Sequence, residues 1–229
     1  MALLLCIESS AEVCSVALAR DGEVVSLREN GLERQHAKLL APYIFEVMSE
    51  ANIRPSQLDA VAVSQGPGSY TSLRIGTSVA KGLCYGAGKP LVAVSSLQSL
   101  AMLAVAGGSV LPSDLLCPLL DARRMEVYTA LYDARGLPQT DVTAQVVDER
   151  TLADRLDAQR ILFFGSGAEK CRDVIRHPNA MFLHVPTSAR GMVGLAQQRY
   201  AQKLLEDVAY FEPFYLKDFV AGVSVKKML

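Results

Sequence analysis

The stretch "SQGPGSYTSLRIG" (residues 64–76) decides the fold prediction, because a strand, a glycine turn and a helix meet within it. The apolar run "DAVAVS" before it is typical of a short buried strand. Gly66 and Gly68 then interrupt the apolar pattern, and the following residues predict a helix over about 71–85. A strand followed by a tight turn and a helix is the unit from which α/β folds are built.

The glycine turn has two interpretations. Its backbone N–H groups, with the positive end of the helix dipole, could bind an anion, and Ser69 or Thr71 could cap the helix or contact a phosphate. The turn lacks the Gly-Lys-Ser/Thr ending of a P-loop, where the lysine and a metal-bound hydroxyl do the chemistry. We therefore favour the other interpretation, a tight turn that Gly66 and Gly68 permit and that a serine caps.

Strands and helices alternate on both sides of this stretch. The apolar segment 3–8 predicts a first strand, and Asp21-Gly22 between two apolar runs predicts a hairpin, so three antiparallel strands open the chain. "AKLLAPYIFEVMSEAN" predicts a helix, in which Pro42 either starts the regular part or kinks it. After the central stretch, "KPLVAVSS" predicts a strand and "SLQSLAMLAVA" a helix.

A segment rich in Gly, Ser and Pro at 106–114 divides the chain into two halves. Beyond it, two strands around 121–124 are followed by a short helix, a strand, the Gly165-Ser166-Gly167 turn, a strand over 180–185 and a long helix over 188–207. We predict an N-terminal lobe of residues 1–105, joined by the C-terminal segment 207–229, and a smaller lobe of residues 106–206.

Composition excludes several classes of protein. Half of the 229 residues are hydrophobic and 21% are charged, which is typical of a globular protein with a core. The formal net charge of −1 lacks the basic excess of a protein that grips nucleic acid by itself. Five scattered cysteines without a CxxC pair suggest reduced thiols. With no signal peptide or membrane-spanning run recognised, we expect a cytoplasmic protein without membrane contact.

Several motifs together resemble one family. "LLLCIESSAEVCSVAL", "QHAKLLAPYI", "GPGSYTSLRIGTSVAKGL", "DARRMEVYTALY" and "EPFYLK" match, in this order, segments typical of the TsaB (YeaZ) family. The matches run from the first residues to the closing segment, so the resemblance covers essentially the whole chain. The glycine motif and the "DARR" strand in this order are its most specific part.

The resemblance implies a fold, a function and partners. The implied fold is α/β, actin-like and sugar-kinase-like, with two lobes that each hold a mixed sheet flanked by helices. The implied function is that of a scaffold or regulatory subunit. It would support the catalytic paralogue TsaD, which transfers threonylcarbamoyl from threonylcarbamoyl-AMP to the adenosine beside the anticodon of tRNAs reading codons that begin with A. The ATPase TsaE would be a further partner, tRNA would bind only through the complex, and the chain alone would form a homodimer.

The resemblance also locates metal ligands that this chain lacks. TsaD-like proteins carry two histidines four residues apart on the helix after "PLVAVSS", and such a pair can grip one metal ion. Those positions fall near Ser96 and Leu100 here. We therefore expect no metal and no catalytic residues. A TsaD-like metalloenzyme with unusual ligands remains a weaker alternative.

Candidate nucleotide-binding residues lie in the predicted turns. Glu8 stands where many relatives have Asp, and without a metal its expected role is to cap the serine turn that follows it. "DARRME" forms a charged cluster that either is a solvated turn or lines the cleft between the lobes. ATP or ADP at a subunit interface is compatible with the scaffold role, and an actin-fold ATPase or phosphotransferase acting alone is the alternative function. The candidates are Glu8, Ser9, Ser10, Gly66, Gly68, Ser69, Asp121, Arg123, Gly165 and Gly167.

The two helices of the first lobe supply candidate interface residues. Both helices have an apolar face, and small residues on the second would let another helix approach closely. We predict that TsaD, or a second copy of this chain, docks on these faces. The candidates are His36, Leu40, Ile44, Met48, Thr71, Leu73, Arg74, Gly76 and Ala80.

Overall fold

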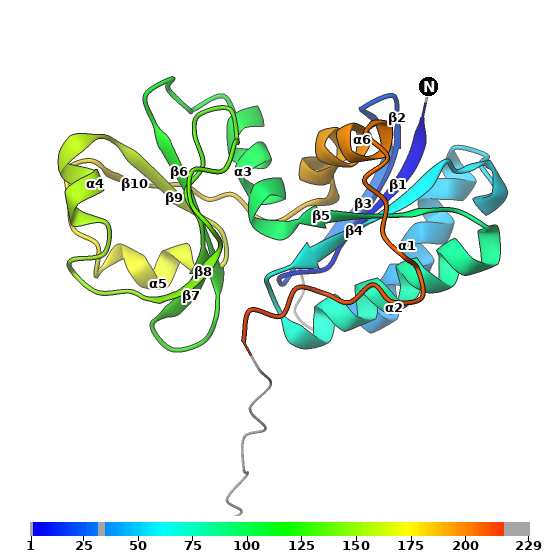
Figure 1. Ribbon diagram of the computed structural model, residues 1–229, viewed down its shortest axis with the longest axis horizontal. Helices are drawn as coiled ribbons and strands as arrows, with labels where there is room; N and C mark the ends of the chain where they lie inside the picture. Colours follow the sequence, from blue (N-terminus) through cyan, green and yellow to red (C-terminus); the bar gives the residue numbers. More distant parts are fainter. Residues whose placement is uncertain (1, 32–34, 218–229) are drawn as a thin grey trace, which may run out of the picture.

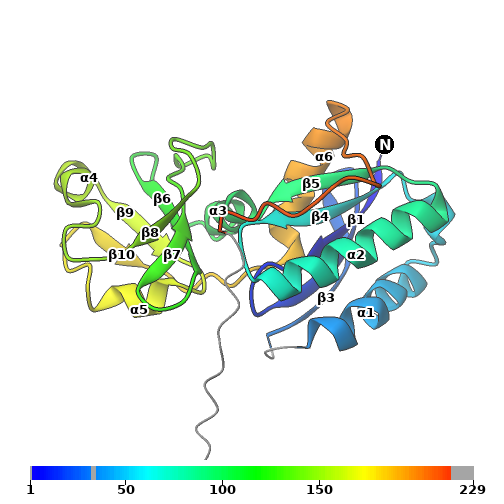
Figure 2. The same ribbon diagram turned by 60° about the horizontal axis from the view of Figure 1, so that its bottom comes forward.

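The first lobe is a five-stranded sheet with helices on both faces (Figures 1 and 2). The structure, a computed structural model, describes residues 2–31 and 35–217. The strands lie in the order β3-β2-β1-β4-β5, with β1, β4 and β5 parallel and β2 antiparallel to both of its neighbours. Their bounds are β1 Leu3–Glu8, β2 Cys14–Arg20, β3 Glu23–Asn30, β4 Ala60–Gly66 and β5 Leu91–Ser95.

Local sequence explains the opening strands. Asp21 and Gly22 both have a left-handed backbone, with φ of 52° and 87°, which is the conformation that a two-residue hairpin needs. Successive side chains of β1 face opposite sides of the sheet, so that Leu5 enters one core and Cys6 the other. The predicted hairpin and the three opening strands are therefore confirmed. All five cysteines are buried and unpaired.

Helices cover the two faces of the first sheet. On one face lie α1 (His36–Glu50) and α2 (Tyr70–Ala87), and on the other lie the short helix η2 (Ala189–Met192) and α6 (Val193–Ala201). Pro42 lies inside α1 and does not start it. The short helix η1 (Pro55–Gln57) precedes β4. Helix α3 (Ser96–Ala106) lies between the lobes, where it packs on β6 and on η2 (Figure 1).

The second lobe is also a mixed sheet flanked by helices. Its strands lie in the order β10-β9-β6-β7-β8, with β6, β9 and β10 parallel and β6, β7 and β8 antiparallel. The two-lobed α/β fold class is thus confirmed. The bounds are β6 Leu115–Asp121, β7 Glu126–Thr129, β8 Thr143–Val146, α4 Ala153–Ala158, β9 Ile161–Phe164, α5 Ala168–Arg172 and β10 Ala180–Phe182.

The chain passes from the second lobe back to the first earlier than predicted. Residues up to 206 were expected in the second lobe, but η2 and α6 pack against the first sheet, where Met192 and Ala196 fill the same core as Leu4. The helix predicted over 188–207 ends at residue 201, because the chain turns at Lys203, with φ 57°, and then pairs with β5. The strand predicted over 180–185 ends at residue 182, and β8 was not predicted. Residues 218–229 of the predicted C-terminal segment 207–229 lie outside the described residues.

Candidate functional site

A cleft of about 750 Å³ lies between the two lobes. The loop after β1, the turn before α2, the turn between β6 and β7, and residues 214–217 all line it. These segments come from four of the quoted motifs, which are far apart in the sequence. The cleft is therefore where the motifs meet, and the charged "DARRME" cluster does line it.

The glycines of the turn before α2 are packed against the chain's own backbone. A Cβ on Gly68 would overlap the carbonyl oxygen of Ser10, and a Cβ on Gly66 would lie 2.9 Å from that of Phe214. Gly66 also has a φ of 106°. Ser69 caps α2 by accepting a hydrogen bond from the N–H of Ser72. This geometry supports the interpretation as a tight, capped turn.

The glycines of the second turn are packed in the same way. A Cβ on Gly165 would lie 2.6 Å from the carbonyl oxygen of Leu119, and one on Gly167 would lie 2.9 Å from a methyl group of Val127. The Gly167 N–H donates to the Leu119 carbonyl at 2.8 Å. Of this turn only Ser166 lines the cleft. In the two glycine turns, the N–H groups of Gly66, Ser69 and Gly167 already donate to acceptors of the chain itself, so the geometry does not favour an ATPase acting alone.

Glu8 organises the loop after β1. The Ser10 N–H donates to Glu8 Oε1 at 2.6 Å, and the Ser9 N–H donates to the Ser64 hydroxyl at 3.0 Å. Burial raises the pKa of Glu8, although hydrogen bonds from Ser10, Ser64 and Ser9 oppose this shift. Glu8 and Ser9 lie beneath the cleft, whereas Ser10 lines it. This arrangement fits the capping role considered for Glu8.

Two lysines pair with Asp121 and Glu126, two acidic residues that line the cleft. Lys170 on α5 forms an ion pair with Asp121, and its ammonium group also donates to the carbonyl oxygens of Arg124 and Glu126, both at 2.7 Å. Lys217 forms an ion pair with Glu126. Sequence reasoning did not identify either lysine. Lys217 belongs to the closing motif and could have been found from it, whereas Lys170 belongs to none of the motifs that carry the resemblance.

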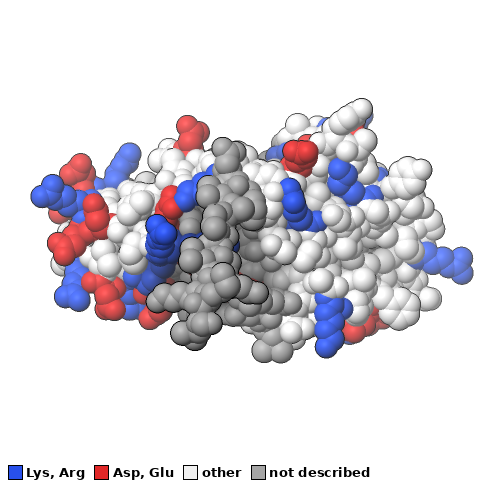
Figure 3. Space-filling view, turned by 90° about the horizontal axis from the view of Figure 1, so that it is seen from below, with Lys and Arg blue, Asp and Glu red and all other residues white. Residues whose placement is uncertain are grey.

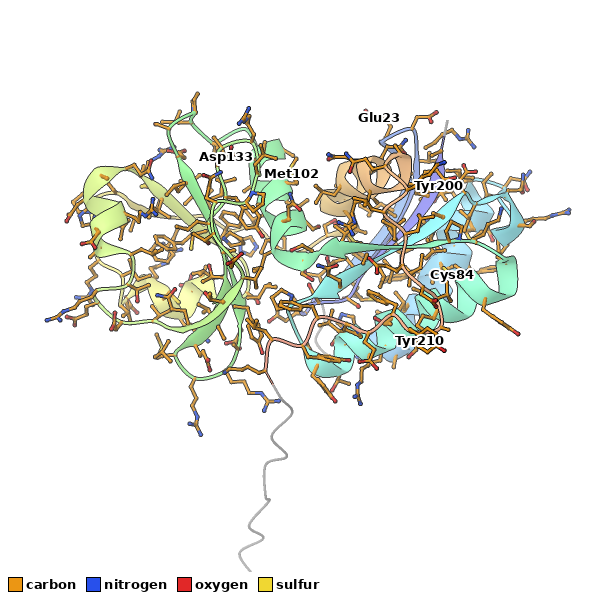
Figure 4. The ribbon with its side chains drawn as sticks, in the orientation of Figure 1. Glu23, Cys84, Met102, Asp133, Tyr200 and Tyr210 are labelled. Carbon is orange, nitrogen blue, oxygen red and sulfur yellow. The ribbon has the colours of Figure 1, made fainter. Side chains whose placement is uncertain are left out.

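Residues 207–217, which we call the closing segment, run along α2 toward the cleft (Figure 1). The ammonium group of Lys81 donates to the carbonyl oxygens of Ala209 and Phe211, both at 3.0 Å. Nearer the cleft, the Phe214 N–H donates to the Gln65 carbonyl at 2.7 Å. Figure 4 shows Tyr210 on the part of the segment beside α2. The segment is therefore anchored to α2 and β4 along its length.

An aromatic and arginine cluster joins the closing segment to the start of α2. The rings of Tyr70 and Tyr215 have centroids 4.7 Å apart and planes tilted by 44°. The guanidinium group of Arg74 lies 4.2 Å from the centroid of Tyr70, and its Nε–H donates to the Tyr215 hydroxyl at 3.3 Å. Arg74 was predicted as an interface residue, but neither tyrosine was named as a site residue.

Most predicted interface residues are buried in the first lobe's own core. Of the nine, only Thr71 and Arg74 are exposed. His36 contacts the Val13 carbonyl at 3.3 Å, and burial lowers its pKa. As the structure stands, the buried residues cannot be the surface that meets a partner, because the apolar periodicity identified the side facing the sheet. They are His36, Leu40, Ile44, Met48, Leu73, Gly76 and Ala80.

The outer face of α1 and α2 carries other residues. We call this outer face the docking face and define it by Phe45, Ser78, Gly82, Tyr85 and Gly86, all of which are exposed. Phe45 is 72% exposed and Tyr85 is 88% exposed. A Cβ on Gly82 or Gly86 would meet no atom within 4 Å. The face therefore combines large aromatic rings with open space over the helix backbone.

Ser96 and Leu100, the two positions aligned with the metal ligands of TsaD-like proteins, are buried and have structural contacts. The Ser96 hydroxyl accepts a hydrogen bond from the Gly66 N–H at 3.1 Å, and Leu100 is buried between the lobes. Among residues 2–31 and 35–217, no three His, Cys, Asp or Glu side chains come together as a possible metal site. No helix in these ranges has the length and apolar character needed to cross a membrane.

Comparisons with known proteins agree with the motifs. The TsaD family, described as tRNA N6-adenosine threonylcarbamoyltransferase, matches residues 30–224. The tRNA threonylcarbamoyladenosine biosynthesis protein TsaB of Haemophilus influenzae is 30% identical over 236 residues, which cover 95% of this chain and 94% of that protein. The solved structure of YeaZ from Pseudomonas aeruginosa has a TM-score of 0.79 at 27% identity, over 94% of this chain and all of that one.

A more distant solved structure shows the fold alone. The activator of the 2-hydroxyisocaproyl-CoA dehydratase from Clostridium difficile, with bound ADPNP, has a TM-score of 0.52 at 10% identity. It covers 90% of this chain and 98% of its own. The two-lobed architecture is thus shared by proteins whose sequences have diverged widely.

Proposed function

The chain belongs to the TsaB (YeaZ) family, and from that premise we propose that it is a scaffold subunit that binds and supports the catalytic paralogue TsaD. It takes part in the biosynthesis of threonylcarbamoyladenosine in tRNA. The docking face is the observation that carries the scaffold proposal. In this proposal the chain presents a surface to TsaD and does not itself transfer the threonylcarbamoyl group.

The chemistry of the docking face suits a helical partner. An exposed aromatic surface is characteristic of protein interfaces, and Phe45 and Tyr85 expose most of their side chains to solvent. The small residues Ser78, Gly82 and Gly86 recur every four residues along α2. Without bulky side chains, the backbone of another helix can come close. A paralogue of the same fold has an equivalent helix pair to offer, and so has a second copy of this chain.

The remaining partners follow from the same role. We propose that TsaD displaces a homodimer formed through the docking face, that TsaE joins the assembled complex, and that the complex works in the cytoplasm. ATP or ADP would be held at the joint between subunits. The closed glycine turns support that location, because a site within this chain alone would need an open cradle.

Gly82→Arg tests the docking face with a matched control. The new side chain enters open space, so the chain should fold, but it would obstruct a close helix contact. Gly194→Arg makes the same change at another exposed helical glycine, on α6, where a Cβ also meets nothing within 4 Å. We expect Gly82→Arg to abolish co-elution with TsaD and Gly194→Arg to leave it intact.

Reconstitution tests the function itself. Transfer RNA would be incubated with TsaD, TsaE and the enzyme that supplies threonylcarbamoyl-AMP, with and without this chain. We expect modification to depend on the chain and on an intact docking face. Equal modification without the chain, or no association of the wild-type chain with TsaD, would disprove the scaffold proposal.

A further inference from the structure

Two arginines stand at the rim of the cleft between the lobes. Arg123 and Arg124 occupy the turn between β6 and β7 with left-handed backbones, and both side chains are exposed. We call this pair the arginine rim. The neighbouring carboxylates of Asp121 and Glu126 are each held by a lysine. Within residues 2–31 and 35–217 neither arginine forms an ion pair, so the rim presents two positive charges that this part of the chain does not neutralise.

Aromatic rings of the first lobe line the same cleft. Tyr70 and Tyr215 are half-buried and in contact with each other, and the cation of Arg74 lies beside them. Nucleobases stack on such rings in proteins that bind single-stranded nucleic acid, while arginines follow the backbone. The cleft therefore offers groups for phosphates on the second lobe and groups for bases on the first.

The position of the positive charges favours a strand over a free nucleotide. A mononucleotide held deep between the lobes needs free N–H groups at the glycine turns, where those of Gly66, Ser69 and Gly167 already donate within the chain. The free cations lie at the solvent-facing rim instead. In Figure 3, Lys and Arg side chains are visible on the surface of both lobes, with Asp and Glu side chains among them. A ligand whose phosphates run along the surface fits this arrangement better than one enclosed by it.

We propose that the arginine rim binds the sugar-phosphate backbone of an RNA strand while the complex modifies it. This inference rests on the proposed function, because the net charge of −1 makes strong RNA binding by the chain alone unfavourable. The partner subunit supplies the remaining contacts. The rim positions RNA through phosphates and carries no sequence preference of its own.

The double variant Arg123→Gln/Arg124→Gln tests the proposal in the complex with TsaD. The control, Arg150→Gln/Arg155→Gln, removes the same amount of positive charge elsewhere on the second lobe. Arg155 lies in α4, Arg150 lies just before it, and both are exposed. RNA affinity would be measured by fluorescence anisotropy at several salt concentrations. We expect the slope of log affinity against log salt to fall by about 1.4 for the rim variant, since each lost phosphate contact on a single strand contributes about 0.7. The control should keep the wild-type slope.

The outcomes separate the two proposals. If the wild-type chain does not associate with TsaD, the proposed function fails and this inference fails with it. If the complex forms and modifies tRNA but the rim variant keeps wild-type RNA affinity and salt slope, only this inference is overturned. It is also overturned if ATP or AMP binds the isolated chain and the rim variant abolishes that binding, because the rim would then serve a mononucleotide.

Discussion

Lys217 of the closing segment forms an ion pair with Glu126 of β7. The segment is anchored to α2 and β4 of the first lobe, so this ion pair joins the two lobes across the cleft. Glu126 comes from the "DARRME" motif and Lys217 from "EPFYLK". Two motifs about ninety residues apart in the sequence are thus joined by one charge contact.

Lys217→Met should loosen the closing segment without unfolding the protein. Both side chains are partly exposed, so the pair contributes less than about 1 kcal/mol to the free energy of unfolding. We expect hydrogen exchange at the Phe214 amide to become about threefold faster, as a local opening cost lower by about 0.6 kcal/mol implies. Arg135→Gln, which breaks an exposed pair with Asp133 inside the second lobe, should leave that amide unchanged. Unchanged exchange in Lys217→Met would show that the pair does not restrain the segment.

Gly76→Ala and Gly82→Ala should change stability in opposite directions, although both glycines lie in α2. A Cβ on Gly76 would overlap the Ser9 hydroxyl beneath the helix, whereas one on Gly82 would meet nothing. We expect Gly76→Ala to lower the free energy of unfolding by about 1–3 kcal/mol and Gly82→Ala to raise it by up to about 1 kcal/mol. Urea unfolding followed by circular dichroism measures both. A stabilising Gly76→Ala would contradict the packing described here.

Glu8→Gln should be more stable than wild type at neutral pH. Burial raises the pKa of Glu8 in the folded chain above the value of about 4.3 expected after unfolding. The folded state therefore holds a proton that the unfolded state releases, and stability falls as pH rises from about 4.3 through the folded pKa. Glutamine has no such proton and can still accept from the Ser10 N–H.

Urea unfolding across a pH series checks the Glu8 prediction. Glu8→Gln should lack the decline that wild type shows on the alkaline side of pH 4.3. Glu23→Gln, at an exposed position on the β2–β3 hairpin (Figure 4), should keep it. Parallel curves for Glu8→Gln and wild type would mean that Glu8 titrates as it does in the unfolded chain.

Asp114→Asn should destabilise the second lobe. Arg160 donates to both oxygens of this buried carboxylate, at 2.6 and 2.7 Å. Burial alone would raise the pKa of Asp114, but hydrogen bonds from Arg160 and the Leu111 N–H outweigh it and lower the pKa. Since Arg160 is partly exposed, we expect a loss of about 2 kcal/mol at pH 7, below the cost of breaking a fully buried pair.

The pH dependence of this loss has a definite sign. The stability that Asp114 supplies is present above its unfolded pKa of about 3.9 and disappears as pH falls through the lower folded pKa. The difference between Asp114→Asn and wild type should therefore shrink in strong acid. Glu46→Gln, which breaks an exposed pair with Arg28, provides the control and should cost less than about 1 kcal/mol. An equal cost for both variants at pH 7 would argue against a special role for burial.

Turns and helix starts could be predicted from the sequence, because a few neighbouring residues determine them. Asp21-Gly22 predicted a hairpin because few residues adopt its left-handed turn. Ser69 was one of two residues considered as the cap of the helix predicted from about residue 71, and it does cap α2, which begins at Tyr70. Helix α6 has no such signal. Its core residues are small or ordinary apolar ones, such as Ala196, and the strand on which they pack lies far away in the sequence. The lobe to which α6 belongs therefore could not be predicted.

The candidate site shows the same limit. Periodicity marked Leu40 and Ile44 correctly as one face of a helix, but it could not distinguish burial in the chain's own core from burial against a partner. The residue that departs from this pattern is Phe45, a large aromatic side chain that lies outside the apolar stripe and is exposed. Gly66 and Gly165 were likewise visible in the sequence as turn residues. Only the structure shows that the atoms facing them belong to Phe214 and Leu119, which lie far away along the chain.

The placement of η2 and α6 has a consequence for synthesis on the ribosome. One face of the first sheet packs under residues 189–196, so that face stays bare until the whole second lobe has been translated. A nascent chain that stalls within the second lobe exposes the apolar side chains of β1, β4 and β5, which are prone to aggregate. The lobe that begins first is thus completed last, and the second lobe is an insertion into it.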